Sequence, residues 1–186
     1  MNRAAHEVKD SLNGVSLNLE VIRSRTSRQG GGGGGDSQAL AVFSTAALEQ
    51  LELLTLRTEA VLFLTRPARE PADVALALRH LASLLIPATK ADGGRLTVEG
   101  YQRSVPTTAT PSVTRLAVTA GLLALTSHGG SGRCTLESEP ETLVRFSHES
   151  GSPRSLDGPV ASVITEHSIR IHESGADLIL AFPRPL

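Results

Sequence analysis

Residues 8–22 read VKDSLNGVSLNLEVI, and the spacing of their apolar side chains decides the fold of the first part of the chain. The apolar residues recur in alternating steps of four and three, which is the seam of a helix packed in a left-handed bundle. The pattern predicts a helix that ends near Arg28. Its seam consists of Val8, Leu12, Val15, Leu19 and Ile22.

A run of six glycines follows this helix and cannot remain helical, so we predict a flexible connector at residues 29–36. Asp36 and Ser37 are suitable caps for a second helix. That helix carries an apolar face until Pro67 and Pro71 end it. The face consists of Leu40, Phe43, Ala47, Leu51, Leu54 and Val61, and is broadened by Leu53, Leu56, Ala60 and Phe63.

Two long helices joined by a short flexible loop form an antiparallel hairpin. A lone hairpin buries only one side of each helix, and the remaining apolar surface requires a partner. Pairing two hairpins into a four-helix bundle meets this requirement. We therefore predict a homodimer and a first domain of residues 1–68.

Beyond the hairpin, helices and strands alternate, which predicts a second domain of residues 69–186 with the α+β class of fold and helices on one face of a mixed sheet. In the second of its helices, Leu116, Ala120, Leu123 and Ala124 are expected to face inward. The expected helices are Asp73–Thr89, Val113–Thr126 and Pro159–Glu166, and the expected strands are Leu96–Val98, Gln102–Val105, Arg133–Glu137, Leu143–His148, Ser168–His172 and Asp177–Phe182.

Composition narrows the classes of function. Lysine and arginine together number 18 against 19 for aspartate and glutamate, so no basic surplus favours nucleic acid or an anionic membrane. The one cysteine, Cys134, excludes an intrachain disulfide and fits a reducing compartment. The sequence has no apolar run of the roughly 20 residues that span a bilayer. We expect a soluble cytoplasmic protein whose partner is a protein or a small molecule.

The segment from His6 to Gly14 resembles the H-box of sensor histidine kinases, in which a phospho-accepting histidine precedes an acid, a basic residue, a polar residue and a leucine. Residues 64–67 are similar to the end of the second helix in that family, and Asp73 to Glu99 resembles the start of its ATP-binding domain. The resemblance covers nearly the whole chain. It implies a dimerisation and phosphotransfer hairpin followed by an ATPase-type α/β sandwich.

The departures from that family concern its nucleotide site. Gly121 and Leu125 stand where two asparagines would hold magnesium, and neither side chain can ligate a hard cation. The adenine-reading motif is reduced at residues 148–152, the second glycine-rich loop is reduced at residues 156–159, and the chain leaves no room for a long ATP lid. The resemblance therefore implies a degenerate domain that uses no nucleotide, as in bacterial histidine phosphotransferases that resemble histidine kinases.

His6 is the candidate phosphoacceptor. A neutral imidazole is nucleophilic near pH 7 because its ordinary pKa is about 6.5. The heptad places His6 off the seam, where a partner's aspartyl phosphate can approach in line. Glu7 could hydrogen-bond the imidazole, and Asp10 lies one turn further on the same outward face.

The expected partners are the receiver domains of response regulators, which bring their own magnesium, so this chain needs no cofactor or metal of its own. We expect the receiver to bind the exposed side of the first helix at Lys9, Asn13 and Leu17, with help from the second helix near Leu53 and Leu56.

Three functions remain open from the sequence. The first is a relay that passes phosphoryl groups between receivers through His6 without ATP. The second is a non-catalytic pseudo-kinase dimer that binds or sequesters a receiver. The third, an active kinase, requires a nucleotide site that the sequence does not contain. The bland interpretation of His6 is an ordinary residue near the N-terminus, and its setting before Glu7, Lys9 and Leu12 favours the acceptor role.

Overall fold

The computed structural model describes residues 12–17, 19–24, 34–65, 71–126, 131–149, 151 and 153–185. The chain divides into two compact units, and the division falls between Phe63 and Leu64. The first unit is helical and the second is α+β, so each is described by itself.

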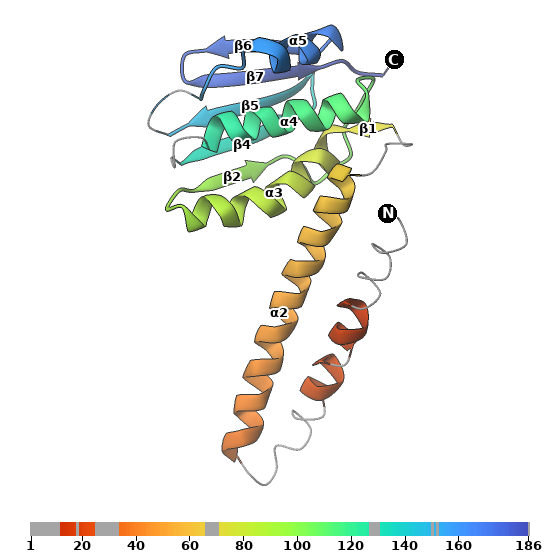
Figure 1. Cartoon of the computed structure of the whole chain (residues 1–186), viewed down its shortest axis with the longest axis vertical. Helices are drawn as coiled ribbons and strands as arrows, with labels where there is room; N and C mark the ends of the chain where they lie inside the picture. Colours follow the sequence, from red (N-terminus) through yellow and green to blue (C-terminus); the bar gives the residue numbers. More distant parts are fainter. Residues whose placement is uncertain are drawn as a thin grey trace. The chain divides into compact units, whose positions relative to one another are not determined.

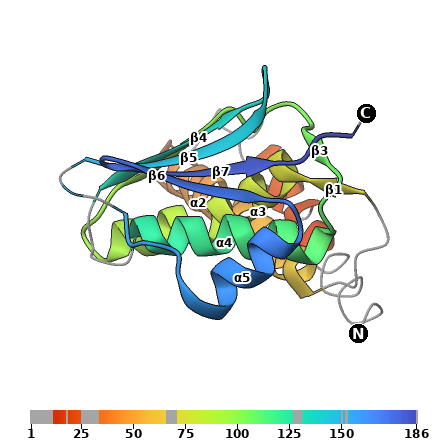
Figure 2. The ribbon, with the colours of Figure 1, turned by 90° about the horizontal axis from the view of Figure 1, so that it is seen from above.

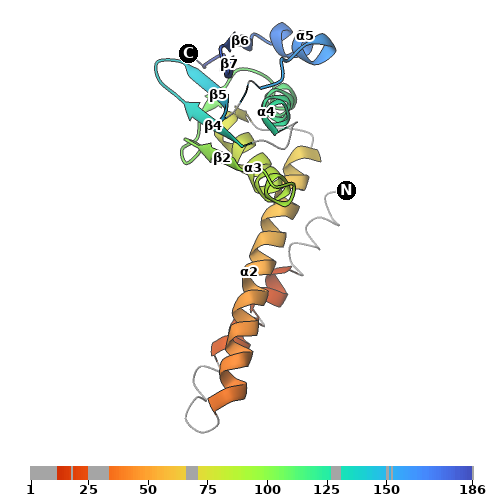
Figure 3. The same ribbon diagram turned by 90° about the vertical axis from the view of Figure 1, so that its left-hand side faces the viewer.

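In the first unit, residues 12–17 and 19–24 are helical and lie beside the long helix α2, Gly34–Thr65 (Figures 1 and 3). The predicted connector at residues 29–36 is too long at its end, because Gly34, Gly35 and Asp36 already belong to α2. Extending an established helix adds one hydrogen bond per residue fixed, which offsets the low helix propensity of glycine. The rest of the connector lies outside the described residues.

Burial along α2 differs from the predicted face. Leu51 and Ala60 are buried as expected, together with Ser44 and Leu48, which the sequence pattern had not selected. The predicted face residues Phe43, Leu54 and Val61 are exposed, and so are Val42 and Leu56. A single copy of the chain thus leaves much apolar surface of α2 in contact with solvent.

The second unit is a sheet covered on one face by three helices (Figure 2). The five-stranded sheet has the order β2-β4-β5-β7-β6; β2 and β4 are parallel and the other neighbours are antiparallel. A second, two-stranded sheet joins β1 and β3. The elements are β1 Ala72–Asp73, α3 Val74–Ala91, β2 Leu96–Glu99, β3 Pro106–Thr107, α4 Pro111–Thr126, β4 Gly132–Glu137, β5 Thr142–His148, α5 Gly158–Glu166, β6 Arg170–Ser174 and β7 Asp177–Phe182.

The predicted α+β class, the mixed sheet and the helices on one face are therefore confirmed. Burial alternates along β4 and β5, as it does in a strand with one face against a core. Cys134 and Phe146 point into that core and are fully buried. Burial raises the pKa of the Cys134 thiol far above its ordinary value, so it stays protonated and acts as a small apolar residue.

The predicted strand Gln102–Val105 is wrong. The strand in this region is β3, Pro106–Thr107, and it pairs with β1. The residues before it form a turn that Asp73 holds in place: its carboxylate accepts hydrogen bonds from the Leu76 N–H at 2.9 Å, the Val105 N–H at 3.2 Å and the Ser104 hydroxyl. Asp73 thus caps α3 and fixes the turn before β3.

α3 is, among the described residues, the one helix long and apolar enough to cross a bilayer by length and composition alone. Its inward face packs into the second unit, and α3 contacts both β2 and α4. The buried residues are Val74, Ala75, Ala77, Leu78, Leu81, Ala82 and Thr89. This is the environment of a core helix.

Candidate functional site

The predicted catalytic residues His6, Glu7 and Asp10, and the predicted receiver contact Lys9, lie outside the described residues. The other two predicted receiver contacts, Asn13 and Leu17, are described. Both are exposed on the helical segment that follows the H-box-like sequence, and Leu17 is 67% exposed.

Val21 extends this surface by one turn. Asn13, Leu17 and Val21 are spaced by four residues, which is the spacing of one helix face. Asn13 and Leu17 lie on the helical segment 12–17, and Val21, which is 47% exposed, lies on the helical segment 19–24. Val21 was not among the predicted receiver contacts, although its spacing of four residues from Leu17 is the signal that could have identified it. We call these three residues the outer stripe.

The predicted seam runs along the opposite side of the same helix. At 100° per residue, Val15 and Ile22 lie on the side away from Leu17. Both are exposed, whereas the other described seam residues, Leu12 and Leu19, are half-buried. The described part of the first helix thus carries two separate apolar surfaces. On the second helix, Leu56 is exposed, and the side chain of Leu53 lies outside the described residues.

In the second unit, Gly121 and Leu125, the positions predicted to correspond to two magnesium-binding asparagines, face the sheet. A Cβ atom built at Gly121 would lie 2.3 Å from Phe146 Cζ, and a Cβ atom built at Gly132 would lie 2.5 Å from Leu125 Cδ1. Gly121 and Leu125 are therefore packed between α4 and the sheet. Both are core positions in this chain, and their correspondence to the two asparagines stays a prediction.

The same packing explains why the predicted inward face of α4 is partly wrong. Leu116 and Leu123, which were expected to face inward, are exposed on α4. The inward face is formed instead by residues that fit against Phe146 and the neighbouring helices. Apolar residues occur almost all around α4, so periodicity alone did not identify the buried side. The buried residues are Val113, Thr114, Ala117, Val118, Gly121, Leu122, Ala124 and Leu125.

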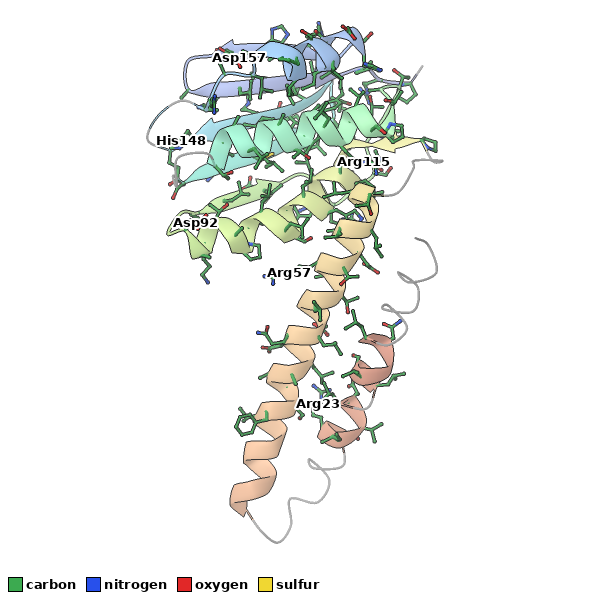
Figure 4. All side chains as sticks on the ribbon, viewed as in Figure 1. Arg23, Arg57, Asp92, Arg115, His148 and Asp157 are labelled. Atoms are coloured by element: carbon green, nitrogen blue, oxygen red, sulfur yellow. The ribbon has the colours of Figure 1, made fainter. Side chains whose placement is uncertain are left out.

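The connection from β5 to α5 is short, and hydrogen bonds from three of its described residues attach it: the Glu149 N–H donates to the Ser131 carbonyl oxygen at 3.0 Å, and Arg154 and Ser155 make the other two bonds. It runs from His148 at the end of β5 to Asp157 at the start of α5, both labelled in Figure 4. The Arg154 N–H donates to the Ala124 carbonyl oxygen on α4 at 3.1 Å, and the Ser155 hydroxyl donates to Glu173 on β6. These contacts hold the connection against its own unit.

The outer face of the sheet carries a charged cluster. Arg145 on β5 donates to the Asp177 carboxylate on β7 at 2.9 Å and lies 3.6 Å from the Glu137 carboxylate on β4. Hydrogen bonds from Ser147 and then Arg145 lower the pKa of Asp177, and the bond to Asp177 raises the pKa of Arg145. Such pairs stabilise neighbouring strands and form no metal site. Among the described residues, no group of three or more His, Cys, Asp or Glu side chains is placed to hold a metal ion.

No protein-family model and no curated protein matches this sequence. Solved structures of histidine kinases are similar to it. The Acinetobacter baumannii histidine kinase AdeS is 11% identical with a TM-score of 0.44, over 91% of this chain and 95% of that one. A blue-light activated histidine kinase of Erythrobacter litoralis is 17% identical with a TM-score of 0.49, over 79% of this chain and 59% of that one.

Full-length ShkA, solved in complex with AMPPNP, is 18% identical with a TM-score of 0.42 over 97% of this chain. This chain spans 44% of the length of ShkA. The structural neighbours are thus histidine kinases or parts of them. At these TM-scores the likeness by itself assigns neither the fold nor an activity to this chain.

Proposed function

We propose that this chain is a histidine phosphotransferase of a two-component phosphorelay, which passes phosphoryl groups between receiver-domain aspartates through His6 without ATP. The observation that carries the proposal is the outer stripe. Asn13, Leu17 and Val21 are exposed and partly apolar, have the spacing of one helix face, and lie on the two helical segments that follow the His6-Glu7 sequence. An exposed leucine opposite a seam has no role in the seam, whereas it is the kind of residue that a protein partner covers.

The chemistry requires two transfers. In the first, the unprotonated imidazole nitrogen of His6 attacks the phosphorus of an aspartyl phosphate; the N–P bond forms, the bond to the aspartate oxygen breaks and the carboxylate leaves. The imidazolium is positively charged while its second nitrogen keeps its proton, and Glu7 is the neighbouring carboxylate that can accept a hydrogen bond from it. In the second transfer, the aspartate of another receiver attacks and the steps reverse. Magnesium belongs to the receivers in both directions.

The seam surface supports a homodimer. Val15 and Ile22 on the first helix, and Phe43, Leu54 and Val61 on α2, are exposed in a single copy. Side chains of this kind lose contact with water when two hairpins pair, and each contributes about 1.5–3 kcal/mol when fully buried. The proposed assembly is therefore a four-helix bundle whose seam faces inward and whose outer stripe faces the receiver.

The second unit supports transfer without ATP in one respect. The connection from Glu149 to Asp157 is attached to α4 and to β6, and it leads directly into α5. That arrangement leaves no long insertion between β5 and α5 to close over a nucleotide. The proposed setting is the cytoplasm, where receivers reside, without a nucleic-acid or membrane partner.

The test is transfer of labelled phosphate from a phosphorylated receiver to the chain, with His6→Ala as the variant that should accept none. A pseudo-kinase that only sequesters receivers would bind the receiver and remain unlabelled. An active kinase would be labelled by ATP alone, and ATP with magnesium would raise its melting temperature.

A further inference from the structure

Helix α5 contributes one fully buried side chain to the second unit. It has nine residues, Gly158–Glu166, all of them described, and its one buried residue is Ile164. Val160 and Val163 on the same helix are 37% and 36% exposed. A docked amphipathic helix buries a residue on every turn. α5 is therefore anchored mainly by Ile164, while Val160 and Val163 stay partly exposed.

The start of α5 is weakly stabilised, whereas backbone hydrogen bonds close its last turn: the His167 and Ile169 N–H groups donate to the Ile164 carbonyl oxygen, and the Ser168 N–H donates to that of Thr165. At its start, the Asp157 side chain makes no capping hydrogen bond, and Gly158 has a positive φ of 64°. Past its end, Ser168 has a φ of 62°, a conformation that residues with a Cβ rarely adopt. Ile169, the next residue, is fully buried just before β6. The strained turn thus lies between α5 and a fixed point of the core.

Hydrogen bonds attach the described residues of the connection before α5 to the second unit. The Glu149 N–H donates to the Ser131 carbonyl oxygen, the Arg154 N–H donates to the Ala124 carbonyl oxygen on α4, and Ser155 makes an exposed side-chain bond to Glu173. Water competes with the exposed bond. These hydrogen bonds bury no apolar surface themselves, and apolar burial is what raises the free energy of local opening.

We propose that α5 is a displaceable strap on α4: residues 158–168 open as a unit, with hinges at Gly158 and Ser168, while α4 and the five-stranded sheet stay folded. Opening removes Ile164 from the core and uncovers the part of α4 that α5 contacts. α4 already presents Leu116 and Leu123 to solvent, so the open state has a larger apolar surface on this helix.

Native-state hydrogen exchange on the full chain tests this proposal. Amides of α5 should exchange at least about tenfold faster than the interior amides of α4 in the absence of denaturant, because local opening is far less costly than global unfolding. The two helices should converge to one rate only as denaturant approaches the global transition. Equal protection of α5 and α4 without denaturant would overturn the proposal.

Three variants sharpen the test. Ile164→Ala should speed exchange in α5 more than about tenfold while α4 is unchanged, because it removes the anchor. Val163→Ala is the matched control on the same helix, and it should change exchange in α5 by less than about threefold. Ser168→Gly should slow exchange in α5 several-fold, because glycine adopts the positive φ without strain. Acceleration of α4 together with α5 in Ile164→Ala, or no slowing in Ser168→Gly, would show that α5 is an integral part of the core.

Discussion

Gly121 on α4 lies directly against the ring of Phe146 on β5, so closely that a Cβ atom at Gly121 would lie 2.3 Å from Phe146 Cζ. Phe146 is fully buried, and the ring occupies the volume that any side chain at position 121 would need. The contact sets the distance between α4 and the sheet. It also shows why this glycine belongs to the core of the second unit.

Gly121→Ala should lower the free energy of unfolding by about 1–3 kcal/mol, the usual effect of overpacking a core, even though alanine favours a helix more than glycine does. Urea denaturation measures the change. The matched control is Gly14→Ala, where the added Cβ meets nothing within 4 Å and helix propensity alone should raise stability by up to about 1 kcal/mol. Combining Gly121→Ala with Phe146→Leu should recover part of the loss. Equal effects of the two alanine substitutions would contradict the packing described.

Asp73→Ala should destabilise the second unit by about 1–3 kcal/mol, because it removes the cap of α3 and leaves the Leu76 and Val105 N–H groups without their acceptor. Asp73→Asn keeps a side-chain oxygen at the cap and should lose less. Ser104→Ala removes one exposed bond and should lose least. Chemical denaturation ranks the three variants, and a different order would refute the role given to Asp73.

Stability in acid should depend on Asp177. Hydrogen bonds from Ser147 and Arg145 lower its pKa in the folded state below the ordinary value of 3.8. The carboxylate therefore stabilises the fold at pH values above the ordinary pKa. This contribution is lost as the pH falls through the lower pKa of the folded state. The free energy of unfolding of the wild type should exceed that of Asp177→Asn by about 0.2–1 kcal/mol at neutral pH, because the Arg145–Asp177 pair is partly exposed. Thermal unfolding across pH should show the difference shrinking in acid; a difference that widens there would be evidence against this assignment.

Substitutions on the two surfaces of the first helix should have different effects on dimerisation and on receiver binding. Val15→Asp with Ile22→Asp places charges on the seam and should weaken the dimer at least about 100-fold, measured by light scattering against concentration. Leu17→Asp with Val21→Asp places the same charges on the outer stripe, and should leave the dimer intact while weakening receiver binding. The two double variants are matched in number and kind of change. Loss of the dimer in both, or in neither, would contradict the division into two surfaces.

The sequence predicted the element order of the second unit well where strands and helices have distinct periods. The burial of β4 and β5 alternates as their sequences do, and the hairpin of β6 and β7 turns at Gly175, which has a positive φ. α4 was different, because its apolar residues surround the helix and only the fit of Gly121 to Phe146 selects the buried side. That contact joins residues 25 positions apart in the chain, a separation at which local patterns carry no information.

The candidate site was predicted only in part for a related reason. Exposure of Asn13 and Leu17 follows from helical spacing, and both are exposed. The turn at residues 102–105 could not be predicted, because its hydrogen bonds go to a distant carboxylate, Asp73, which no local pattern reveals. The roles of His6, Glu7, Lys9 and Asp10 stay predictions, because these residues lie outside the described part of the chain.

The most direct measurement mixes a receiver carrying labelled aspartyl phosphate with the purified chain and follows label on each protein over time. Wild type should gain label as the receiver loses it, and should then pass it to a second, unphosphorylated receiver. His6→Ala should gain none, and labelled ATP with magnesium should label neither protein. Label on His6→Ala, or label from ATP alone, would contradict the account, as would a wild-type chain that binds the phosphorylated receiver and never carries its phosphate.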